Sequence, residues 1–143
     1  GVLLLFGGGI TLSTLMQSSG ASAWMAGGIS QMLPAEHPWL LYLLVALFVV
    51  YLTELVSNTA SAALLVPLFM PVAVAVGASP VVTAAIIGVA ASCAFMLPVA
   101  TPPNALAFGT GCIPQREMIR AGMRLNLIAT FLIAGLLMAL LSQ

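Results

Sequence analysis

Long apolar stretches alternate along the whole chain with short interruptions rich in polar residues, proline or glycine. A helix needs roughly 20 apolar residues to cross the hydrocarbon core of a bilayer, and several of these stretches approach that length. They comprise residues 2–16, continued by a shorter piece at 21–33, and residues 39–56, 60–76, 81–99 and 125–141. The pattern therefore predicts an all-α membrane protein built from transmembrane helices.

The interruptions divide the chain into parts. Proline, glycine and polar residues mark turns outside the hydrocarbon, as at residues 34–38 and 77–80. We expect transmembrane or arm helices at residues 1–33, a hairpin at 38–77, a broken transmembrane helix at 81–112, a loop at 113–124 and a last, plain apolar transmembrane helix at 125–143.

The composition supports the membrane assignment. Hydrophobic residues make up 62% of the chain and charged residues 4%, whereas soluble domains carry about 25% charged residues. Residues 55–115 contain no charge at all, which the water-exposed surface of a globular fold would not tolerate. A net charge of zero gives no electrostatic footprint for nucleic acid. The sequence also lacks nucleotide-binding, metalloprotease and nucleophile-elbow motifs, so we do not expect an enzyme.

The few charges also indicate how the chain is oriented. All three arginines, Arg116, Arg120 and Arg124, fall in the predicted loop at residues 113–124. Positive charge collects on the cytoplasmic side of membrane proteins, so we expect this loop in the cytoplasm and Gln143 outside. The chain is thus expected to belong to an integral protein of the cell (inner) membrane.

The triplet Ser57-Asn58-Thr59 joins two long apolar arms without a glycine, proline or charge. Loops exposed to water normally carry such residues, so the triplet is typical of the tip of a re-entrant hairpin whose backbone faces a cavity. The first arm would present carbonyl groups suited to a small cation, and the second would present N–H groups suited to an anion. The alternative is a polar turn satisfied by neighbouring helices.

The run Thr101-Pro102-Pro103-Asn104 interrupts an apolar stretch a second time. Two adjacent prolines remove two backbone donors and force a helix to break, and the apolar sequence resumes directly afterwards. We therefore expect a break inside the bilayer, with free carbonyl groups after Val99 and free N–H groups beyond Asn104. Such discontinuous helices mark the substrate and ion sites of secondary transporters. The alternative is a proline kink repaired by neighbouring helices.

The residue types near the two breaks favour an anion that is carried together with a cation. No Arg, Lys or His lies close to either break in the sequence, so helix N-termini, hydroxyl groups and a co-bound cation would have to neutralise an anion. Glu54 is the ionisable residue beside the hairpin tip. It is either a proton or cation ligand or a carboxyl group that hydrogen-bonds the broken backbone and holds the hairpin, and we favour the second interpretation.

Three segments resemble a known family. Residues 53–60 (Thr-Glu-Leu-Val-Ser-Asn-Thr-Ala), 91–98 (Ala-Ser-Cys-Ala-Phe-Met-Leu-Pro) and 100–104 (Ala-Thr-Pro-Pro-Asn) are similar to the divalent anion:sodium symporters, the INDY-type di- and tricarboxylate transporters. The resemblance covers the whole chain, as the C-terminal part of such a transporter. It implies an inverted-repeat, elevator-type architecture in which two Ser-Asn-Thr hairpins meet near the bilayer midplane, and this chain contains one of them.

The resemblance also implies roles for individual residues. The substrate carboxylate would contact Ser57, Asn58 and Thr59, and the same pocket would be lined by Thr101 and Pro102. A sodium ion would be bound by Thr53, Asn58 and the backbone carbonyl groups of Val56 and Ala100. The N-terminal repeat of the same transporter would complete the substrate pocket, and the full-length protein would be a homodimer.

We therefore expect part of a sodium-coupled symporter that imports citrate or dicarboxylates such as succinate or malate. Its partners would be the anion, the sodium ion and the lipid bilayer, and no nucleic acid. One alternative is a membrane structural fragment that does not transport. Another is a related anion exporter or exchanger, which would move an oxyanion such as arsenite or exchange one carboxylate for another.

Overall fold

The structure is a computed structural model that describes residues 2–32 and 38–141. All regular secondary structure in these two ranges is helical, as the sequence predicts. The helices are α1 (Val2–Ser18), α2 (Ala21–Met32), α3 (Pro38–Leu52), α4 (Asn58–Ala75), α5 (Pro80–Ala90), α6 (Pro102–Gly109) and α7 (Gln115–Leu141). Most of the predicted turn at residues 34–38 lies outside the described residues, as does Gln143.

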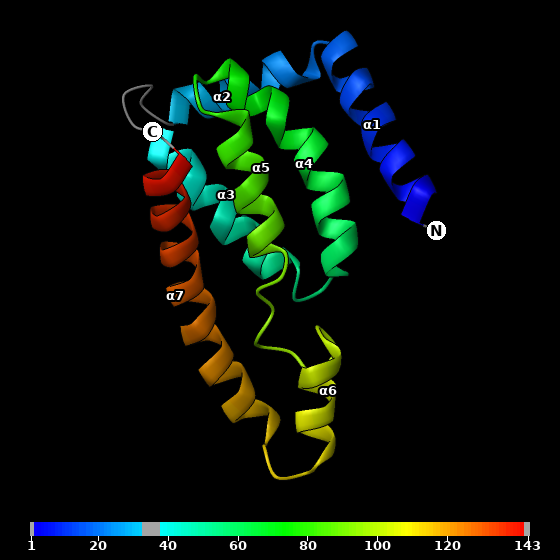
Figure 1. Ribbon diagram of the computed structural model, residues 1–143, viewed down its shortest axis with the longest axis vertical. Coiled ribbons are helices and arrows are strands. Elements are labelled where there is room, and N and C mark those ends of the chain that lie inside the picture. Colours follow the sequence, from blue (N-terminus) through cyan, green and yellow to red (C-terminus); the bar gives the residue numbers. More distant parts are fainter. Residues whose placement is uncertain (1, 33–37, 142–143) are drawn as a thin grey trace.

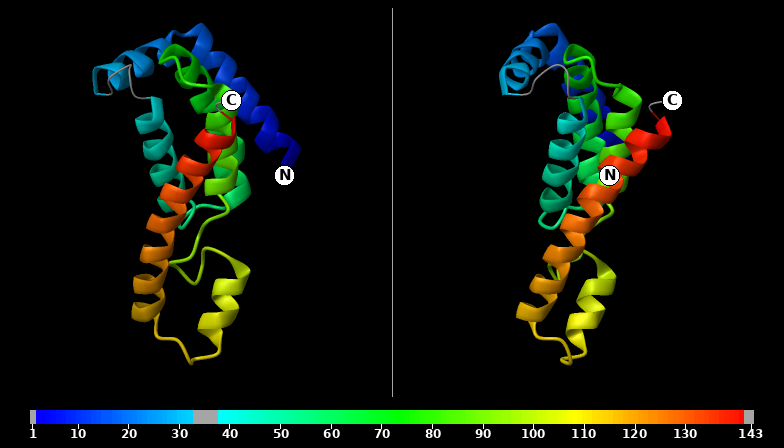
Figure 2. Two further views of the ribbon diagram at one scale, coloured as in Figure 1. Left: turned by 60° about the vertical axis from the view of Figure 1, so that its left-hand side comes forward. Right: turned by 90° about the vertical axis from the view of Figure 1, so that its left-hand side faces the viewer.

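Helices α3, α4, α5 and α7 form the core of the molecule. They lie together in Figures 1 and 2, and α5 contacts each of the other three. Branched apolar side chains fill the space between them, since Val49 of α3, Val72 of α4 and Ile86 of α5 are fully buried. The bundle thereby holds α3 and α4 as a hairpin, whose tip at residues 53–57 lies at the end of the bundle nearest to α6 (Figure 1).

Helices α1 and α2 pack against α4 at the edge of the bundle (Figures 1 and 2). Helix α1 continues through the run of three glycines at residues 7–9 and ends at Ser18. A Cβ atom added at Gly9 would lie 2.6 Å from the carbonyl oxygen of Ala63. Glycine is needed there because the backbones of α1 and α4 approach closely.

The broken helix differs from the prediction in where it breaks. The apolar pattern predicts a helix up to Val99, but α5 ends at Ala90 and residues 91–101 are not helical. The backbone N–H groups of Phe95, Met96 and Leu97 donate to the carboxylate of Glu54 rather than to helix carbonyls. The acceptor for this segment therefore comes from another part of the chain, and the break starts well before the two prolines.

Helix α6 stands apart from the bundle. It begins at Pro102, and none of its residues is buried. Figures 1 and 2 show it beyond the hairpin tip, joined to the lower end of α7 by a short loop. The bundle therefore gives α6 little support, and its position depends on the segment at residues 91–101.

Helix α7 begins earlier than the sequence predicts. Residues 115–124, which the charge pattern placed in a loop, form its first turns. Pro114 precedes the helix, Glu117 lies in its first turn, and Arg120 is 3.2 Å from Glu117, so the charges stabilise a helix start here. The loop between α6 and α7 is consequently short, and the cytoplasmic location of the arginines stays a prediction.

Two helices of the described residues are long and apolar enough to cross a membrane. They are Asn58–Ala75 and Gln115–Ala139, and shorter apolar helices run from Trp39 to Leu52 and from Pro80 to Ala90. The 27 residues of α7 extend over about 40 Å, more than the roughly 30 Å of the hydrocarbon core. Its arginine-bearing first turns therefore have room to lie beyond the hydrocarbon.

Candidate functional site

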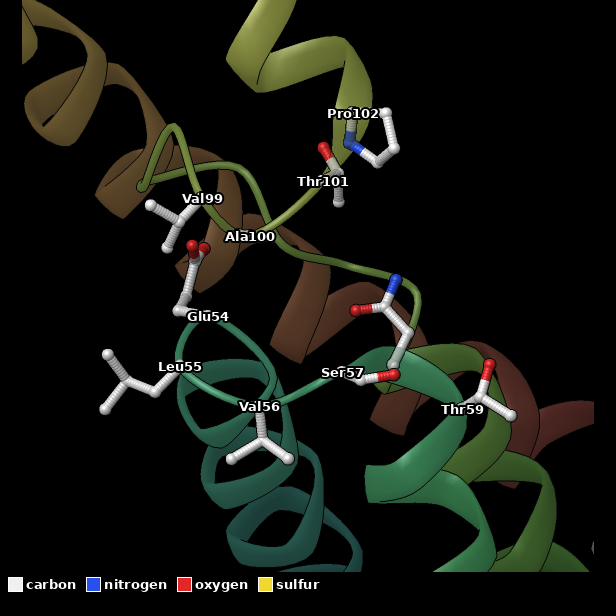
Figure 3. A pocket seen from close by; sticks show the side chains of 10 residues that line it. Glu54, Leu55, Val56, Ser57, Thr59, Val99, Ala100, Thr101 and Pro102 are labelled. Carbon is white, nitrogen blue, oxygen red and sulfur yellow. The ribbon is translucent and has the colours of Figure 1, made fainter. Parts of the chain in front are cut away.

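A cavity of about 370 Å³ lies between the hairpin tip and the second break (Figure 3). Ligand pockets commonly measure about 300–1,000 Å³. The cavity is lined by residues 54–59 on one side and residues 99–102 on the other. All five predicted substrate residues line it: Ser57, Asn58, Thr59, Thr101 and Pro102. The structure thus brings the two polar interruptions of the sequence together in space.

The first turn of α4 opens onto this cavity with its N–H groups uncapped. Ser57 is the N-cap residue, but its side chain makes no capping hydrogen bond. The first N–H groups of a helix have no partner within the helix, so the N–H groups at the start of α4 are available to a ligand. The side chains of Ser57 and Thr59 are exposed beside them. Donors and hydroxyl groups with a partial positive field therefore meet at the hairpin tip.

The first turn of α6 has the opposite character. Its first two residues, Pro102 and Pro103, have no N–H group. The N–H of Asn104 donates to the hydroxyl oxygen of Thr101 over 3.4 Å, and the N–H of Ala105 donates to the Thr101 carbonyl over 3.1 Å. The prediction of free N–H groups beyond Asn104 is therefore wrong, because Thr101 accepts from both.

The side chain of Asn104 closes the break. Its amide nitrogen donates to the carbonyl oxygens of Ala94 at 2.9 Å and Leu97 at 3.1 Å. These carbonyls belong to the non-helical segment that leaves α5, so the start of α6 is pinned to the segment before it. Asn104 belongs to the Thr-Pro-Pro-Asn motif, but the sequence predicted no separate role for its side chain.

The predicted sodium ligands Thr53 and Asn58 lie in contact. The Thr53 hydroxyl oxygen is 2.7 Å from the side-chain oxygen of Asn58 and 2.8 Å from the Ala91 carbonyl oxygen, and Thr53 is fully buried. The other two predicted ligands, Val56 and Ala100, line the cavity, although Thr53 does not. Figure 3 shows the Val56 side chain directed away from residues 99–102, so only its backbone is suited to a ligand there.

This donor set is made of neutral oxygens. Within the described residues no three His, Cys, Asp or Glu side chains form a cluster that would hold a metal ion. Hydroxyl, amide and carbonyl oxygens suit a hard cation. The Ala91 carbonyl, which the sequence analysis did not select, adds a third oxygen beside Thr53 and Asn58.

Glu54 fastens the hairpin tip to the non-helical segment. One of its oxygens accepts from the backbone N–H of Phe95 at 2.7 Å and of Met96 at 2.8 Å, and the other accepts from Leu97 at 3.0 Å. The carboxyl group is 97% buried and also accepts from the side-chain amide of Asn126 at 2.8 Å. These hydrogen bonds agree with the favoured interpretation of Glu54, in which its carboxyl group hydrogen-bonds the broken backbone and holds the hairpin.

The chain matches the family described as "Sodium:sulfate symporter transmembrane region" over residues 1–141. The chain belongs to this family. The resemblance to the divalent anion:sodium symporters, drawn from the sequence motifs, is thereby confirmed.

Several relatives of this chain carry descriptive names. An uncharacterized transporter of Haemophilus influenzae is 54% identical over 134 residues, which are 94% of this chain and 29% of the relative. The sodium-dependent dicarboxylate transporter SdcS of Staphylococcus saprophyticus is 40% identical over 133 residues, 93% of this chain and 25% of the relative. SdcS of Staphylococcus aureus is 42% identical over 133 residues, which are likewise 93% of this chain and 25% of the relative. The chain thus spans between 25% and 29% of the length of these relatives.

The fold of this chain also buries polar residues to which the sequence pattern gave no role. Asn126 and Thr130 of α7 are fully buried, in a stretch that was predicted to be plain and apolar. A polar residue inside a membrane helix usually faces the protein interior and has a partner. A lone Asn at the start of an apolar helix was therefore the available signal, although its partner could not be read from the sequence.

Proposed function

We propose that this chain is the C-terminal part of a sodium-coupled symporter that imports dicarboxylates such as succinate or malate, or citrate. The observation that carries the proposal is the cavity between the hairpin tip and the second break, onto which the uncapped N-terminus of α4 opens, with the contact between Thr53 and Asn58 directly beside it. The names of the staphylococcal relatives supply the ion and the class of anion.

The anion site is proposed to lie at the start of α4. The substrate carboxylate would accept hydrogen bonds from the first N–H groups of α4 and from Ser57, Asn58 and Thr59, while Thr101 and Pro102 form the opposite wall. None of the residues that line the cavity is a cation, so the field of the helix end and a neighbouring sodium ion would offset the negative charge.

The sodium site is proposed to use Thr53, Asn58 and the carbonyl groups of Val56 and Ala100. Thr53 and Asn58 are already in contact, and Val56 and Ala100 line the adjoining cavity. Asn58 belongs to both sets because its amide offers an oxygen to a cation and an N–H to an anion. One side chain shared by the two ligands would couple the binding of the anion to that of sodium.

The proposed architecture is that of a transporter built from membrane helices and re-entrant hairpins. Residues 38–77 would be a re-entrant hairpin, residues 81–112 a broken membrane helix and residues 1–33 further membrane or arm helices. The arginine-bearing start of α7 would face the cytoplasm of a cell (inner) membrane. A second hairpin from the N-terminal repeat would complete the pocket. The full-length protein would work as a homodimer by an elevator-like movement.

Uptake by the full-length protein in proteoliposomes tests this function. Radiolabelled succinate should accumulate under an inward sodium gradient and not under an equal potassium gradient. Asn58→Ala should abolish uptake, whereas Gln115→Ala, an exposed amide residue outside the cavity, should not. Sodium-independent exchange of internal for external succinate would instead identify an exchanger, and no uptake of any carboxylate would contradict the substrate class.

A further inference from the structure

Glu54 and Asn126 form a buried polar pair that the proposed substrate and sodium sites do not use. Asn126 is 0% exposed and Glu54 is 3% exposed. The Asn126 amide nitrogen donates to a Glu54 oxygen at 2.8 Å, across 72 residues of sequence. The pair connects the hairpin tip to α7, a helix that contributes no residue to the cavity.

The Glu54 oxygen that accepts from Asn126 also accepts from the N–H groups of Phe95 and Met96. These residues open the segment that ends at Ala100 and Thr101 in the cavity wall. Because one oxygen receives donors from both sides, a shift of α7 at Asn126 is passed to this segment. The carboxylate is therefore the point at which α7, the hairpin tip and the second cavity wall meet.

Close packing one turn before Asn126 fixes α7 at the same place. A Cβ atom added at Gly122 would overlap the carbonyl group of Phe95 and the Cα atom of Met96. The helix is therefore attached at two points, to the non-helical segment through the backbone at Gly122 and to Glu54 through the side chain of Asn126. Two attachments on one face of a helix set both its distance and its rotation.

The orientation of the Asn126 amide is set by Glu54 and leaves one atom without a partner. The Asn126 side-chain oxygen is buried and makes no hydrogen bond within the described part of the chain. Turning the amide over would aim this oxygen at the carboxylate. A buried acceptor left unpaired costs free energy, so the contact with Glu54 is kept at the expense of full hydrogen bonding.

We propose that Asn126 is a positioning residue: acting through Glu54, it holds residues 95–101 against the hairpin tip, so that the two walls of the cavity stay in register. This inference rests on the proposed function for its effect on transport. Its structural part, the position of residues 99–101, stands independently and is measured separately.

The structural part is tested by thiol labelling of the full-length transporter. In a background where every native cysteine of the full-length protein, Cys93 and Cys112 among them, is replaced by alanine, the half-buried Ala100 is replaced by cysteine. Its rate of reaction with a charged methanethiosulfonate reagent is then measured. Asn126→Leu removes the donor at similar volume and should raise the rate about tenfold. Thr130→Val is the matched control, since Thr130 is equally buried but donates only to the Asn126 carbonyl. Equal rates in the two variants would overturn the inference.

Transport gives the second readout. Asn126→Asp places a second carboxylate against Glu54 and should raise the half-saturating sodium and succinate concentrations about tenfold, with little change in maximal rate per folded transporter. Asn126→Leu removes the donor without adding a charge, so it should raise both values less than Asn126→Asp does. An effect of Asn126→Asp no larger than that of Asn126→Leu, in folded yield or in half-saturation, would overturn the pairing.

The failure of each proposal looks different. If the wild-type protein shows no sodium-driven uptake while Asn126→Leu still speeds labelling at position 100, the symport function fails and the positioning role stands. If the wild type transports with sodium and neither labelling nor half-saturation responds to Asn126, the positioning role fails and the function stands.

Discussion

Helices α4 and α6 both begin at the same cavity, and both follow a residue with a hydroxyl side chain, yet their first turns are built in opposite ways. At α4 the N-cap Ser57 leaves the N–H groups uncapped. At α6 two prolines remove the first two N–H groups and the Thr101 hydroxyl oxygen accepts from the third. The fourth N–H group donates to the carbonyl of the N-cap residue in both helices. The donors that an anion needs are therefore concentrated on the α4 side.

The two helices also differ in how firmly they are held. Helix α4 contributes five buried residues, among them Ala63 and Val72, and contacts α1, α2 and α5. Helix α6 has no buried residue and is tied down by Asn104. The helix end that presents donors is thus rigidly placed, which favours electrostatic preorganisation, while the opposite wall depends on a few hydrogen bonds. This contrast suggests that α4 binds the anion and α6 adjusts to it.

The largest effect is expected when a proline, as found in the first turn of α6, is introduced into the first turn of α4. Thr59→Pro removes one N–H from a turn where proline is accepted, since that N–H has no helical partner. Losing a hydrogen bond to a charged group costs about 1.5–3 kcal/mol. The half-saturating succinate concentration for sodium-driven uptake by the full-length transporter should therefore rise roughly 10- to 100-fold.

Thr59→Val is the control for this variant, because it removes the same hydroxyl group but keeps the N–H. It should have a clearly smaller effect than Thr59→Pro. Equal half-saturation in the two variants would mean that the backbone donors of α4 do not bind the anion.

The next largest effect is expected where α7 supports the α6 side. Gly122→Ala places a methyl group onto the backbone of Phe95 and Met96, and overpacking of this kind costs about 1–3 kcal/mol. The midpoint of thermal unfolding of the detergent-solubilised full-length protein should fall.

Gly135→Ala, on the same helix, is the matched control because no atom lies within 4 Å of the added Cβ. Replacing a helical glycine by alanine in free space gains up to about 1 kcal/mol, so its midpoint should stay or rise. A fall of the same size in both variants would show that glycine flexibility, rather than the contact with residues 95–96, is what α7 requires.

The hairpin side of the cavity could be predicted from the sequence more fully than the α6 side, for a physical reason. The hairpin tip is recognisable locally, because the polar triplet at residues 57–59, without a glycine, proline or charge, separates two apolar arms. The end of α5 is not recognisable locally, because residues 91–97 are apolar and compatible with a helix. The N–H groups of residues 95–97 are instead taken by Glu54, more than 40 residues away in the sequence.

The same reasoning explains the other differences. Residues 115–124 were placed in a loop because they are charged, but Arg and Glu are also good helix formers, and the Glu117–Arg120 pair stabilises the helix. The role of Asn126 depends on a partner 72 residues away. A pattern of single residues predicts where polar groups occur in an apolar chain, but not which of them meet.

A smaller effect is expected from loosening α6. Asn104→Ala removes the two hydrogen bonds to the Ala94 and Leu97 carbonyls. Each typically contributes about 0.5–1.5 kcal/mol. At the lower end of this range the two bonds together contribute about 1 kcal/mol, so amide hydrogen exchange within α6 should become roughly fivefold faster. Thr110→Ala, which removes a hydroxyl bonded to the Ala107 carbonyl at the other end of α6, is the control. Exchange that is equally fast in both would contradict a specific role of Asn104 in pinning α6.

The smallest effect is expected from the reverse exchange, in which α6 gains a donor. Pro103→Ala restores an N–H at the second position of α6 and leaves the bonds of Thr101 to Asn104 and Ala105 intact. If α6 faces the bound anion, the half-saturating succinate concentration should fall by roughly two- to threefold, the lower range for one net hydrogen bond. Pro114→Ala, before α7 and outside the cavity, should leave it unchanged. A higher half-saturating succinate concentration in Pro103→Ala would mean that the rigidity of the prolines matters more for binding than the N–H groups they remove. The two helix ends would then differ in rigidity alone.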